Sequence, residues 1–258
     1  MNIHVKRVIA NKPELVLLHG WGTSSDIWQS WLPNLAEHFS ITCIDLPGLG
    51  RSVAQVEEMS IDHILSAVAA EIPRNCVLLG WSLGGLIATL LVKKIPTKVR
   101  ALITIAYNPC FVQKPGWDTA MPAELLQKFG DDLLRSEQRA LSGFFRLQVQ
   151  GGSASKSILK QLKNIDGQLN HSQLIASLNW LKIDSLAELQ QLEIASLHIY
   201  GEQDQLAPAA LGSQLKKLSK KISTCTIPGA GHLPFLSDAD LVATKLLSFL
   251  AAVDSGER

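Results

Sequence analysis

Short apolar runs recur along the chain, each bounded by turn residues and separated from the next by a segment with helical periodicity. Most of the later runs are continuously apolar, without alternation between apolar and polar positions. That pattern is typical of strands buried on both faces of a parallel sheet. The strands predicted in this way span residues 3–8, 14–18, 41–45, 76–79, 101–106, 196–200 and 223–227.

Apolar residues at helical spacing occupy the intervals, and the predicted helices span residues 26–39, 61–72, 83–94, 208–218 and 238–253. Ser237 precedes the last helix, and serine is a favoured N-cap because its hydroxyl accepts a hydrogen bond from a free N–H of the first turn. Strand and helix alternate. This alternation predicts an α/β fold with a mostly parallel, doubly wound sheet and right-handed crossovers.

One long interval, residues 110–187, contains no strand pattern. Four helical segments punctuated by glycines fill it, at residues 123–129, 136–149, 156–165 and 171–181. A helical insertion in a sheet of this kind most often covers the carboxyl edge of the strands, where ligands bind. We therefore expect residues 1–109 and 188–258 to form the core and residues 110–187 to form a helical lid.

The sequence G-x-S-x-G occupies residues 80–84, between a predicted strand and a predicted helix. In that context the motif is a nucleophile elbow, a strained turn that exposes the serine hydroxyl. The hydroxyl then lies at a helix N-terminus, where N–H groups and the helix dipole favour developing negative charge. Ser82 is therefore the candidate nucleophile; the alternative is a glycine-rich turn with an incidental serine.

A serine nucleophile needs a base, and the base needs an orienting acid. With this elbow, the chain order is serine, then acid, then histidine. Asp204 and Glu202 both follow the next-to-last predicted strand, and His232 lies in the glycine-rich loop after the last one. These loops lie at the same edge of the sheet as Ser82. We favour Asp204 as the acid, with Glu202 as its competitor.

Acyl transfer also needs two donors for the oxyanion. The N–H of Leu83, directly after the nucleophile, is one candidate, and the second comes from a loop after an earlier strand. Trp21 lies in such a loop and supplies the second candidate N–H. His19 in the same loop is expected to be structural, because His232 already fills the base role. The remaining histidines lack metal-ligand spacing, so we expect neither a metal site nor a cofactor.

Composition excludes several functional classes. Of 258 residues, 47% are hydrophobic and 18% charged, which is incompatible with a disordered protein. The net charge of +1 argues against a basic protein that wraps nucleic acid. No apolar run reaches the ~18 residues of a membrane span, and residues 1–6 lack signal-peptide features. We expect no nucleic-acid or membrane partner.

The four cysteines lie far apart and form no C-x-x-C pair. Widely spaced cysteines in apolar runs indicate reduced thiols rather than a disulfide framework. We therefore expect a cytoplasmic protein, and we expect it to be a monomer.

Five motifs, in this order, resemble those of the α/β-hydrolase superfamily across nearly the whole chain. They are His19-Gly20-Trp21-Gly22, the run at residues 45–52, Gly80-Trp81-Ser82-Leu83-Gly84-Gly85, the run at residues 200–204, and Gly229-Ala230-Gly231-His232. The resemblance implies the α/β-hydrolase fold with its inserted lid. It implies less about the substrate, because this fold hosts esterases, C–C hydrolases, haloperoxidases and non-enzymes.

The chain resembles more closely the pimeloyl-acyl-carrier-protein methyl ester esterase family of biotin synthesis. This likeness is carried by the compact size, by Trp21 and Trp81, and by the segments at residues 108–111 and 144–148. It implies a Ser82–Asp204–His232 triad and an apolar channel for the acyl chain, with Trp21, Trp81, Phe129, Phe144 and Leu206 near it. It also implies an acyl-carrier protein docked on a basic lid surface of Arg139, Lys156 and Lys160. Gly143 departs from the family pattern, which has another arginine there.

Charge in the lid partly supports this resemblance. Residues 135–163 contain six basic side chains and one acidic one, an excess of +5 within a chain of net charge +1. The alternative is an ordinary solvated helix face. A rival basic run at residues 216–221 ends a predicted surface helix, where lysines also suit the helix dipole.

The sequence thus predicts a serine carboxylesterase that hydrolyses the methyl ester of pimeloyl-acyl-carrier protein to the carboxylate and methanol. One alternative is another enzyme of this fold, either a general short-chain esterase or a C–C hydrolase or lyase. A second alternative is a non-catalytic module of this fold that binds a small molecule.

Overall fold

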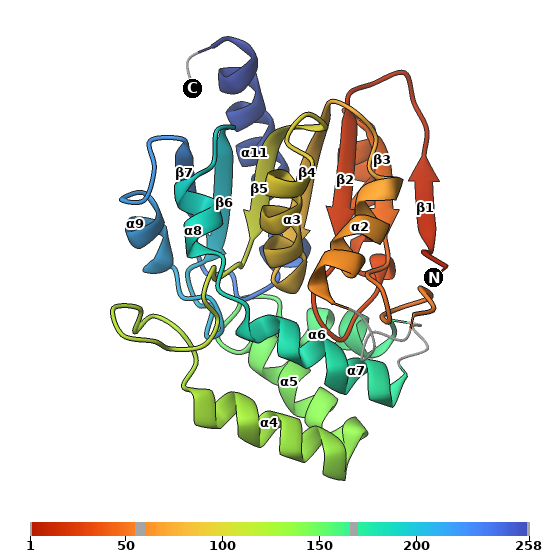
Figure 1. Cartoon of the computed structure of the whole chain (residues 1–258), viewed down its shortest axis with the longest axis vertical. Coiled ribbons are helices and arrows are strands. Elements are labelled where there is room, and N and C mark those ends of the chain that lie inside the picture. Colours follow the sequence, from red (N-terminus) through yellow and green to blue (C-terminus); the bar gives the residue numbers. More distant parts are fainter. Residues whose placement is uncertain (1, 55–59, 166–169, 257–258) are drawn as a thin grey trace.

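The computed structural model describes residues 2–54, 60–165 and 170–256. Its strands form one seven-stranded sheet in the order β1-β3-β2-β4-β5-β6-β7 (Figure 1). β1 is antiparallel to β3, and all the other neighbours are parallel. The predicted fold class is confirmed. The strands are β1 (Val5–Val8), β2 (Glu14–Leu18), β3 (Ser40–Ile44), β4 (Cys76–Trp81), β5 (Val99–Ile105), β6 (Ser196–Gly201) and β7 (Ile222–Ile227).

Burial explains the continuous apolar runs, because every residue of β3, β4 and β6 is buried. β4 is two residues longer than predicted, since Gly80 and Trp81 also pair with residues of β5. β2 has β3 on one side and β4 on the other, so the strand order reverses there. Open sheets bind ligands at the carboxyl ends of the strands beside such a reversal.

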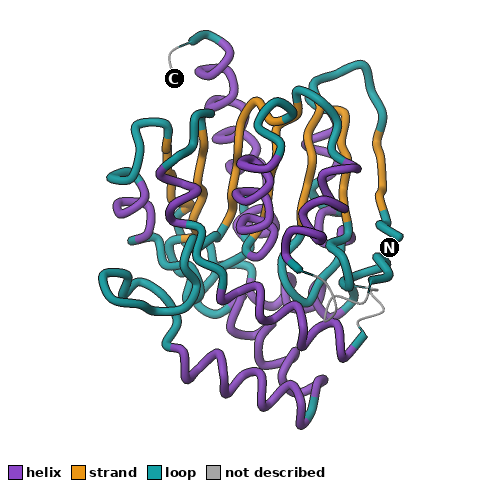
Figure 2. The backbone as a smooth tube through the Cα atoms, in the orientation of Figure 1, coloured by secondary structure: helices purple, strands orange, loops and turns teal. Residues whose placement is uncertain are grey.

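Helices cover both faces of the sheet (Figures 1 and 2). α2 (Ile61–Glu71), α3 (Leu83–Lys94) and α8 (Leu186–Gln190) lie on one face, with α3 between the other two. α11 (Ala239–Asp254) lies on the other face and contacts α1 (Leu32–Ala36). Trp28 and Trp31, just before α1, pack against Phe235 of α10 (Pro234–Ser237) in tilted arrangements, with ring centroids 4.6 and 5.7 Å from it.

Several sequence predictions about helices are wrong in detail. The predicted helix 26–39 is divided into η1 (Ser25–Trp28) and α1, because Pro33 fits the first turn of a helix but cannot continue one. Ser237 is not the N-cap of α11, since it ends α10 and Asp238 takes the cap position. The predicted helix 208–218 contains only the short α9 (Leu211–Leu215).

The insertion between β5 and β6 is helical, as predicted, and lies below the carboxyl ends of the strands in Figure 1. α4 continues through Gly130, where we predicted a break. A Cβ on Gly130 would lie 3.5 Å from Leu178, so the glycine sits where α4 meets α7. The helices are α4 (Ala123–Arg135), α5 (Glu137–Val149), α6 (Ser155–Lys163), α7 (His171–Leu178) and η3 (Asn179–Lys182).

All four cysteines are free thiols, as the sequence indicated. In the described ranges, no helix has the length and apolar character needed to cross a bilayer.

Candidate active site

Ser82 lies between the end of β4 and the start of α3, with φ of 53° and ψ of −116°. This left-handed conformation is strained for a residue with a side chain, and such strain concentrates at functional sites. The turn brings other backbone atoms very close to both flanking glycines. A Cβ on Gly80 would lie 2.1 Å from the Gly84 carbonyl oxygen, and a Cβ on Gly84 would lie 2.1 Å from the Leu18 carbonyl oxygen. The elbow therefore requires glycine at both flanking positions. Ser82 itself is only partly buried.

His232 and Asp204 come together from the loops after β7 and β6. The His232 Nδ1 lies 2.8 and 3.0 Å from the two Asp204 carboxylate oxygens. Asp204 Oδ1 also accepts hydrogen bonds from the N–H groups of Leu206 and Ala207. Both side chains are almost fully buried. The carboxylate accepts from Nδ1, so the neutral ring carries its proton there and its Nε2 is an acceptor.

Glu202, the competing acid, has a different position. Its carboxylate accepts a hydrogen bond from the Gly229 N–H at 2.8 Å and thus holds the loop that leads to His232. Its side chain is exposed, whereas Asp204 is buried against the imidazole. The geometry therefore assigns the orientation of His232 to Asp204.

His232 Nε2 is buried and has no hydrogen-bond partner among the described residues. No hydrogen bond thus joins it to Ser82 in this structure. Catalytic hydrogen bonds are often long or poorly aligned without substrate and tighten in the reacting complex. The arrangement of Ser82, His232 and Asp204 at one sheet edge is therefore suited to acyl transfer.

Backbone donors lie beside the elbow. Leu83 is the first residue of α3, and its N–H has no intrahelical partner at that position. Trp21 follows β2, the strand next to β4, so its N–H comes from the neighbouring loop. Within the part of the chain that the structure describes, neither N–H donates a hydrogen bond. Both are available to an oxyanion.

His19 has the structural position that the sequence indicated. Its Nε2 accepts the Leu46 N–H at 2.9 Å, and its Nδ1 lies 2.8 Å from the Gly20 carbonyl. Complete burial lowers the pKa of His19, because desolvation penalises the charged ring. The neutral ring therefore ties the loop after β3 to the loop that carries Trp21.

The Trp21 side chain connects the elbow region to the lid. Its ring meets Phe129 of α4 and Phe144 of α5 edge-on, with centroids 5.4 and 5.3 Å away. Its indole N–H lies within hydrogen-bonding distance of the Leu174 carbonyl and the Ser177 hydroxyl on α7. Three of the aromatic residues expected at the acyl chain are therefore in one cluster.

Trp81 and Leu206, also expected near the acyl chain, lie elsewhere around the site. The Trp81 ring is 5.7 Å from the His232 ring, and its indole N–H donates to the His232 carbonyl at 2.9 Å. Trp81 is fully buried and thus supports His232. Leu206 is buried directly after the acid loop, and its N–H donates to Asp204.

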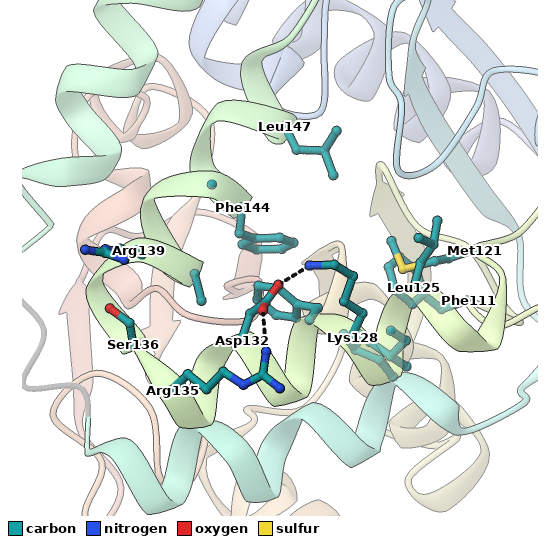
Figure 3. A pocket seen from close by; sticks show the side chains of 15 residues that line it. Phe111, Met121, Leu125, Lys128, Asp132, Arg135, Ser136, Arg139, Phe144 and Leu147 are labelled. Atoms are coloured by element: carbon teal, nitrogen blue, oxygen red, sulfur yellow. Dashed lines mark hydrogen bonds and ion pairs between the residues drawn. The ribbon is translucent and has the colours of Figure 1, made fainter.

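A pocket of about 550 Å³ lies between α4 and α5 (Figure 3). Its walls are mainly apolar and include the Phe129 and Phe144 side chains that contact Trp21. Charged side chains form one side of it, with Asp132 paired to Lys128 and, more distantly, to Arg135. The pocket thus shares Phe129 and Phe144 with the aromatic cluster around Trp21, whereas Ser82, Asp204 and His232 are not among its lining residues.

Of the residues expected to dock a carrier protein, Arg139 lines this pocket, whereas Lys156 and Lys160 are exposed on α6. None of the three forms an ion pair within the described ranges. Gly143 also lines the pocket, and a Cβ there would have no neighbour within 4 Å. The position where the family pattern has an arginine is therefore open.

Gln148, on the last turn of α5, was given no role by the sequence. Its backbone carbonyl accepts a hydrogen bond from the His232 N–H at 3.0 Å. Its side chain is 2% exposed, and its Oε1 has no hydrogen-bond partner among the described residues. The only sequence feature that pointed to Gln148 was its place at the end of the segment 144–148, which carries the family resemblance. That feature does not predict a contact with His232, 84 residues further along the chain.

No group of three or more His, Cys, Asp or Glu side chains in the described part of the chain could hold a metal ion.

Comparison with known proteins gives consistent matches. A model of the alpha/beta hydrolase family matches residues 15–245. The chain is 34% identical to the pimeloyl-acyl-carrier-protein methyl ester esterase of Pectobacterium carotovorum, covering 94% of this chain and 96% of that protein. It is 37% identical to the biotin biosynthesis bifunctional protein BioHC of Teredinibacter turnerae, over 93% of this chain but only 45% of that protein. Among solved structures, an esterase from Exiguobacterium antarcticum superimposes with a TM-score of 0.88 at 21% identity, covering 96% and 95% of the two chains.

Proposed function

Because the chain belongs to the alpha/beta hydrolase family and, within it, to the pimeloyl-acyl-carrier-protein methyl ester esterases, we propose that it hydrolyses the methyl ester of a pimeloyl group carried by an acyl-carrier protein. The observation that carries this proposal is the buried His232–Asp204 pair, which lies at the same sheet edge as Ser82 on its strained elbow. The products are the carrier-bound acid and methanol. The biotin biosynthesis named by the relatives is the pathway that this reaction serves.

In the first half-reaction, the Ser82 hydroxyl attacks the ester carbonyl carbon while His232 Nε2 takes its proton. Asp204 stabilises the imidazolium that forms, because it already accepts from Nδ1. The N–H groups of Leu83 and Trp21 bind the oxyanion. Collapse of this intermediate breaks the bond to the methoxy oxygen, which leaves as methanol with the proton from His232.

In the second half-reaction, water attacks the acyl-enzyme and His232 again serves as the base. The same two N–H groups bind the second oxyanion. Collapse then breaks the bond to Ser82 Oγ, which regains its proton from the imidazolium. The acid is released and the enzyme returns to its starting state.

The pocket between α4 and α5 is the path we propose for the rest of the substrate. Its apolar walls suit the methylene chain, and Phe129 and Phe144 lead from the pocket to Trp21 beside the elbow. Leu206 does not line this pocket, and its N–H donates to Asp204 in the acid loop. The carrier protein then lies outside the pocket, on the lid.

Charge on the lid supports carrier docking there. Arg139 at the pocket and Lys156 and Lys160 on α6 are cations without ion-pair partners among the described residues, and acyl-carrier proteins are acidic. Complementary charge at an interface mainly raises the rate of encounter and is screened by salt. We propose these three side chains as the docking contacts. We propose the cytoplasm as the compartment of the reaction, and the free thiols and the carrier-bound substrate support this.

The chain spans less than half the length of the bifunctional relatives, and our proposal concerns the ester hydrolysis alone.

Another hydrolase activity and a non-catalytic binding role make different predictions. A fluorophosphonate probe should label the wild-type protein at Ser82, whereas an inert binding module would stay unlabelled. Ser82→Ala should prevent labelling and lower kcat by roughly 10⁴–10⁶-fold while leaving the thermal midpoint unchanged. A variant that keeps a tenth of the activity would exclude Ser82 as the nucleophile.

A further inference from the structure

Among the described residues, two buried acceptor atoms of neighbouring residues have no hydrogen-bond partner: Nε2 of His232 and Oε1 of Gln148. The mechanism accounts for the first, which takes the Ser82 proton. It leaves the second without a role. A buried acceptor that lacks a hydrogen bond is destabilising, so its presence beside a catalytic loop calls for a function in the reaction.

Gln148 and His232 are direct neighbours. The Gln148 carbonyl accepts the His232 N–H at 3.0 Å, which places the two residues at adjacent backbone positions. The His232 carbonyl in turn accepts a hydrogen bond from the Trp81 indole N–H. The long Gln148 side chain therefore starts beside a histidine whose own backbone is fixed.

The position of Gln148 on α5 places its side chain on the face toward the elbow loops. Residues 141, 144 and 148 share one face of a helix, because they are three, four and seven positions apart. Leu141 lies 3.5 Å from where a Cβ on Gly22 would be, and the Phe144 ring contacts Trp21. Gln148 extends that face one turn further, toward His232.

We propose that the Gln148 side chain positions the hydrolytic water in the second half-reaction. This inference rests on the proposed ester hydrolysis at Ser82. Water has two O–H groups, and the site offers two free acceptors. One O–H of the attacking water donates to His232 Nε2 and is the proton that is transferred. The other O–H donates to Gln148 Oε1, and a lone pair of the water oxygen is left directed at the acyl carbon.

The step is balanced as ordinary acyl-enzyme hydrolysis. The bond from the water oxygen to the acyl carbon forms, and the carbonyl electron pair moves to the oxyanion. His232 takes one water proton and later gives it to Ser82 Oγ as the acyl–oxygen bond breaks. The second water proton stays on the new carboxyl group throughout, so Gln148 is a positioning residue that exchanges no proton.

The number of O–H groups distinguishes this role from a structural one. Methanol can also attack the acyl-enzyme, but it has a single O–H, which must donate to His232. Methanolysis therefore makes no use of Gln148 Oε1. Loss of the carboxamide should slow attack by water and spare attack by methanol. A structural defect in His232 or α5 would slow both equally, since both nucleophiles use the same base.

The test is nucleophile partitioning with a p-nitrophenyl ester in the presence of a fixed concentration of methanol. In Gln148→Met, which keeps the length of the side chain, the ratio of methyl ester to free acid among the products should rise about tenfold, the value of one hydrogen bond. The rate of the initial p-nitrophenol burst should stay within twofold of wild type, and mass spectrometry should detect accumulated acyl-enzyme. Gln148→Glu, which keeps an acceptor oxygen, should restore a ratio close to wild type.

The matched control is Gln173→Leu, at a buried lid glutamine on α7, which should leave the product ratio unchanged. An unchanged ratio in Gln148→Met would overturn the proposal, whether or not total activity falls. If the Met variant does not fold, the ratios of Gln148→Glu and Gln148→Asn decide: the shorter Asn should raise the ratio and Glu should not, and equal ratios would overturn the proposal. Failure of the wild type to release acid from any ester would contradict the proposed function instead.

Discussion

At the residue scale, the two carboxylates that follow β6 have different contacts. Both Asp204 and Glu202 follow the same strand, and chain order alone does not separate them. The structure does, because Asp204 contacts the His232 ring and Glu202 contacts the Gly229 backbone. We therefore propose that Asp204 orients the base and that Glu202 holds the loop before His232.

Asp204→Asn should lower kcat by about 10⁴-fold, because an amide can donate to Nδ1 and so stabilise the wrong tautomer of His232. Glu202→Gln should change kcat by less than tenfold, since its carboxylate contacts only a backbone N–H. Steady-state kinetics on a p-nitrophenyl ester measure both. A large loss in Glu202→Gln together with a small loss in Asp204→Asn would reverse the assignment.

Gly143 offers a second test at the residue scale. A Cβ there meets no atom within 4 Å, so a side chain is sterically free, and glycine inside a helix costs about 1 kcal/mol relative to alanine. Gly143→Arg should therefore raise the thermal midpoint and also lower KM for a carrier-bound ester. Gly143→Ala is the control, because it should give the stability gain without the change in KM. Equal KM values for the two variants would show that this position does not face the carrier protein.

At the element scale, the residues that follow strand ends were predictable from the sequence, whereas the contacts made by the lid were not. Ser82, Asp204 and His232 were predictable because each lies in the loop or turn after a strand, and strand ends converge at one edge of a parallel sheet. The contacts of Trp21 with α4, α5 and α7 were not predictable, since they depend on how the lid docks across more than 100 residues. Gln148 was missed for the same reason. The split of the helix near Pro33 was within reach, because proline marks a helix start.

Reversal of charge on the lid tests carrier docking. Arg139→Glu and Lys156→Glu should each raise KM for the carrier-bound ester two- to fivefold, since exposed ion pairs contribute about 0.5–1 kcal/mol each. Neither change should affect a short p-nitrophenyl ester, and added salt should weaken only the carrier-bound reaction. Lys216→Glu, on the rival basic run, is the matched control. Equal slowing of both substrates by the double reversal would assign these side chains to lid structure, and a KM effect from Lys216→Glu instead would relocate the docking surface.

At the scale of the whole molecule, buried histidines should govern stability in acid. His198 on β6 is fully buried between Thr104 and Ser196, and desolvation lowers its pKa to about 3. Burial lowers the pKa of His19 as well. In the unfolded chain both rings take up protons below pH ~6.5, whereas the folded chain keeps them neutral. The free energy of unfolding must therefore fall as the pH drops from about 6.5 toward 3.

Between pH 6.5 and pH 5, His198 alone should account for a loss of ~2 kcal/mol. Urea denaturation of His198→Gln at the two pH values should show a loss smaller than that of wild type by about this amount. The exposed His38→Gln should keep the wild-type difference. If His198→Gln is as sensitive to acid as the wild type, the ring is not held neutral in the folded protein.

We propose that the elbow, the lid pocket and the basic lid surface together serve one substrate, a methyl ester held on an acyl-carrier protein. The decisive experiment is the hydrolysis of pimeloyl-acyl-carrier-protein methyl ester, compared with the same acyl methyl ester on a small thiol. We predict that kcat/KM is at least about tenfold higher for the carrier-bound ester, since docking contacts add to binding of the acyl chain. We also predict that methanol is released while the acyl group stays on the carrier, and that Ser82→Ala releases none. Equal kcat/KM for the two substrates, or cleavage of the thioester instead of the methyl ester, would contradict the account.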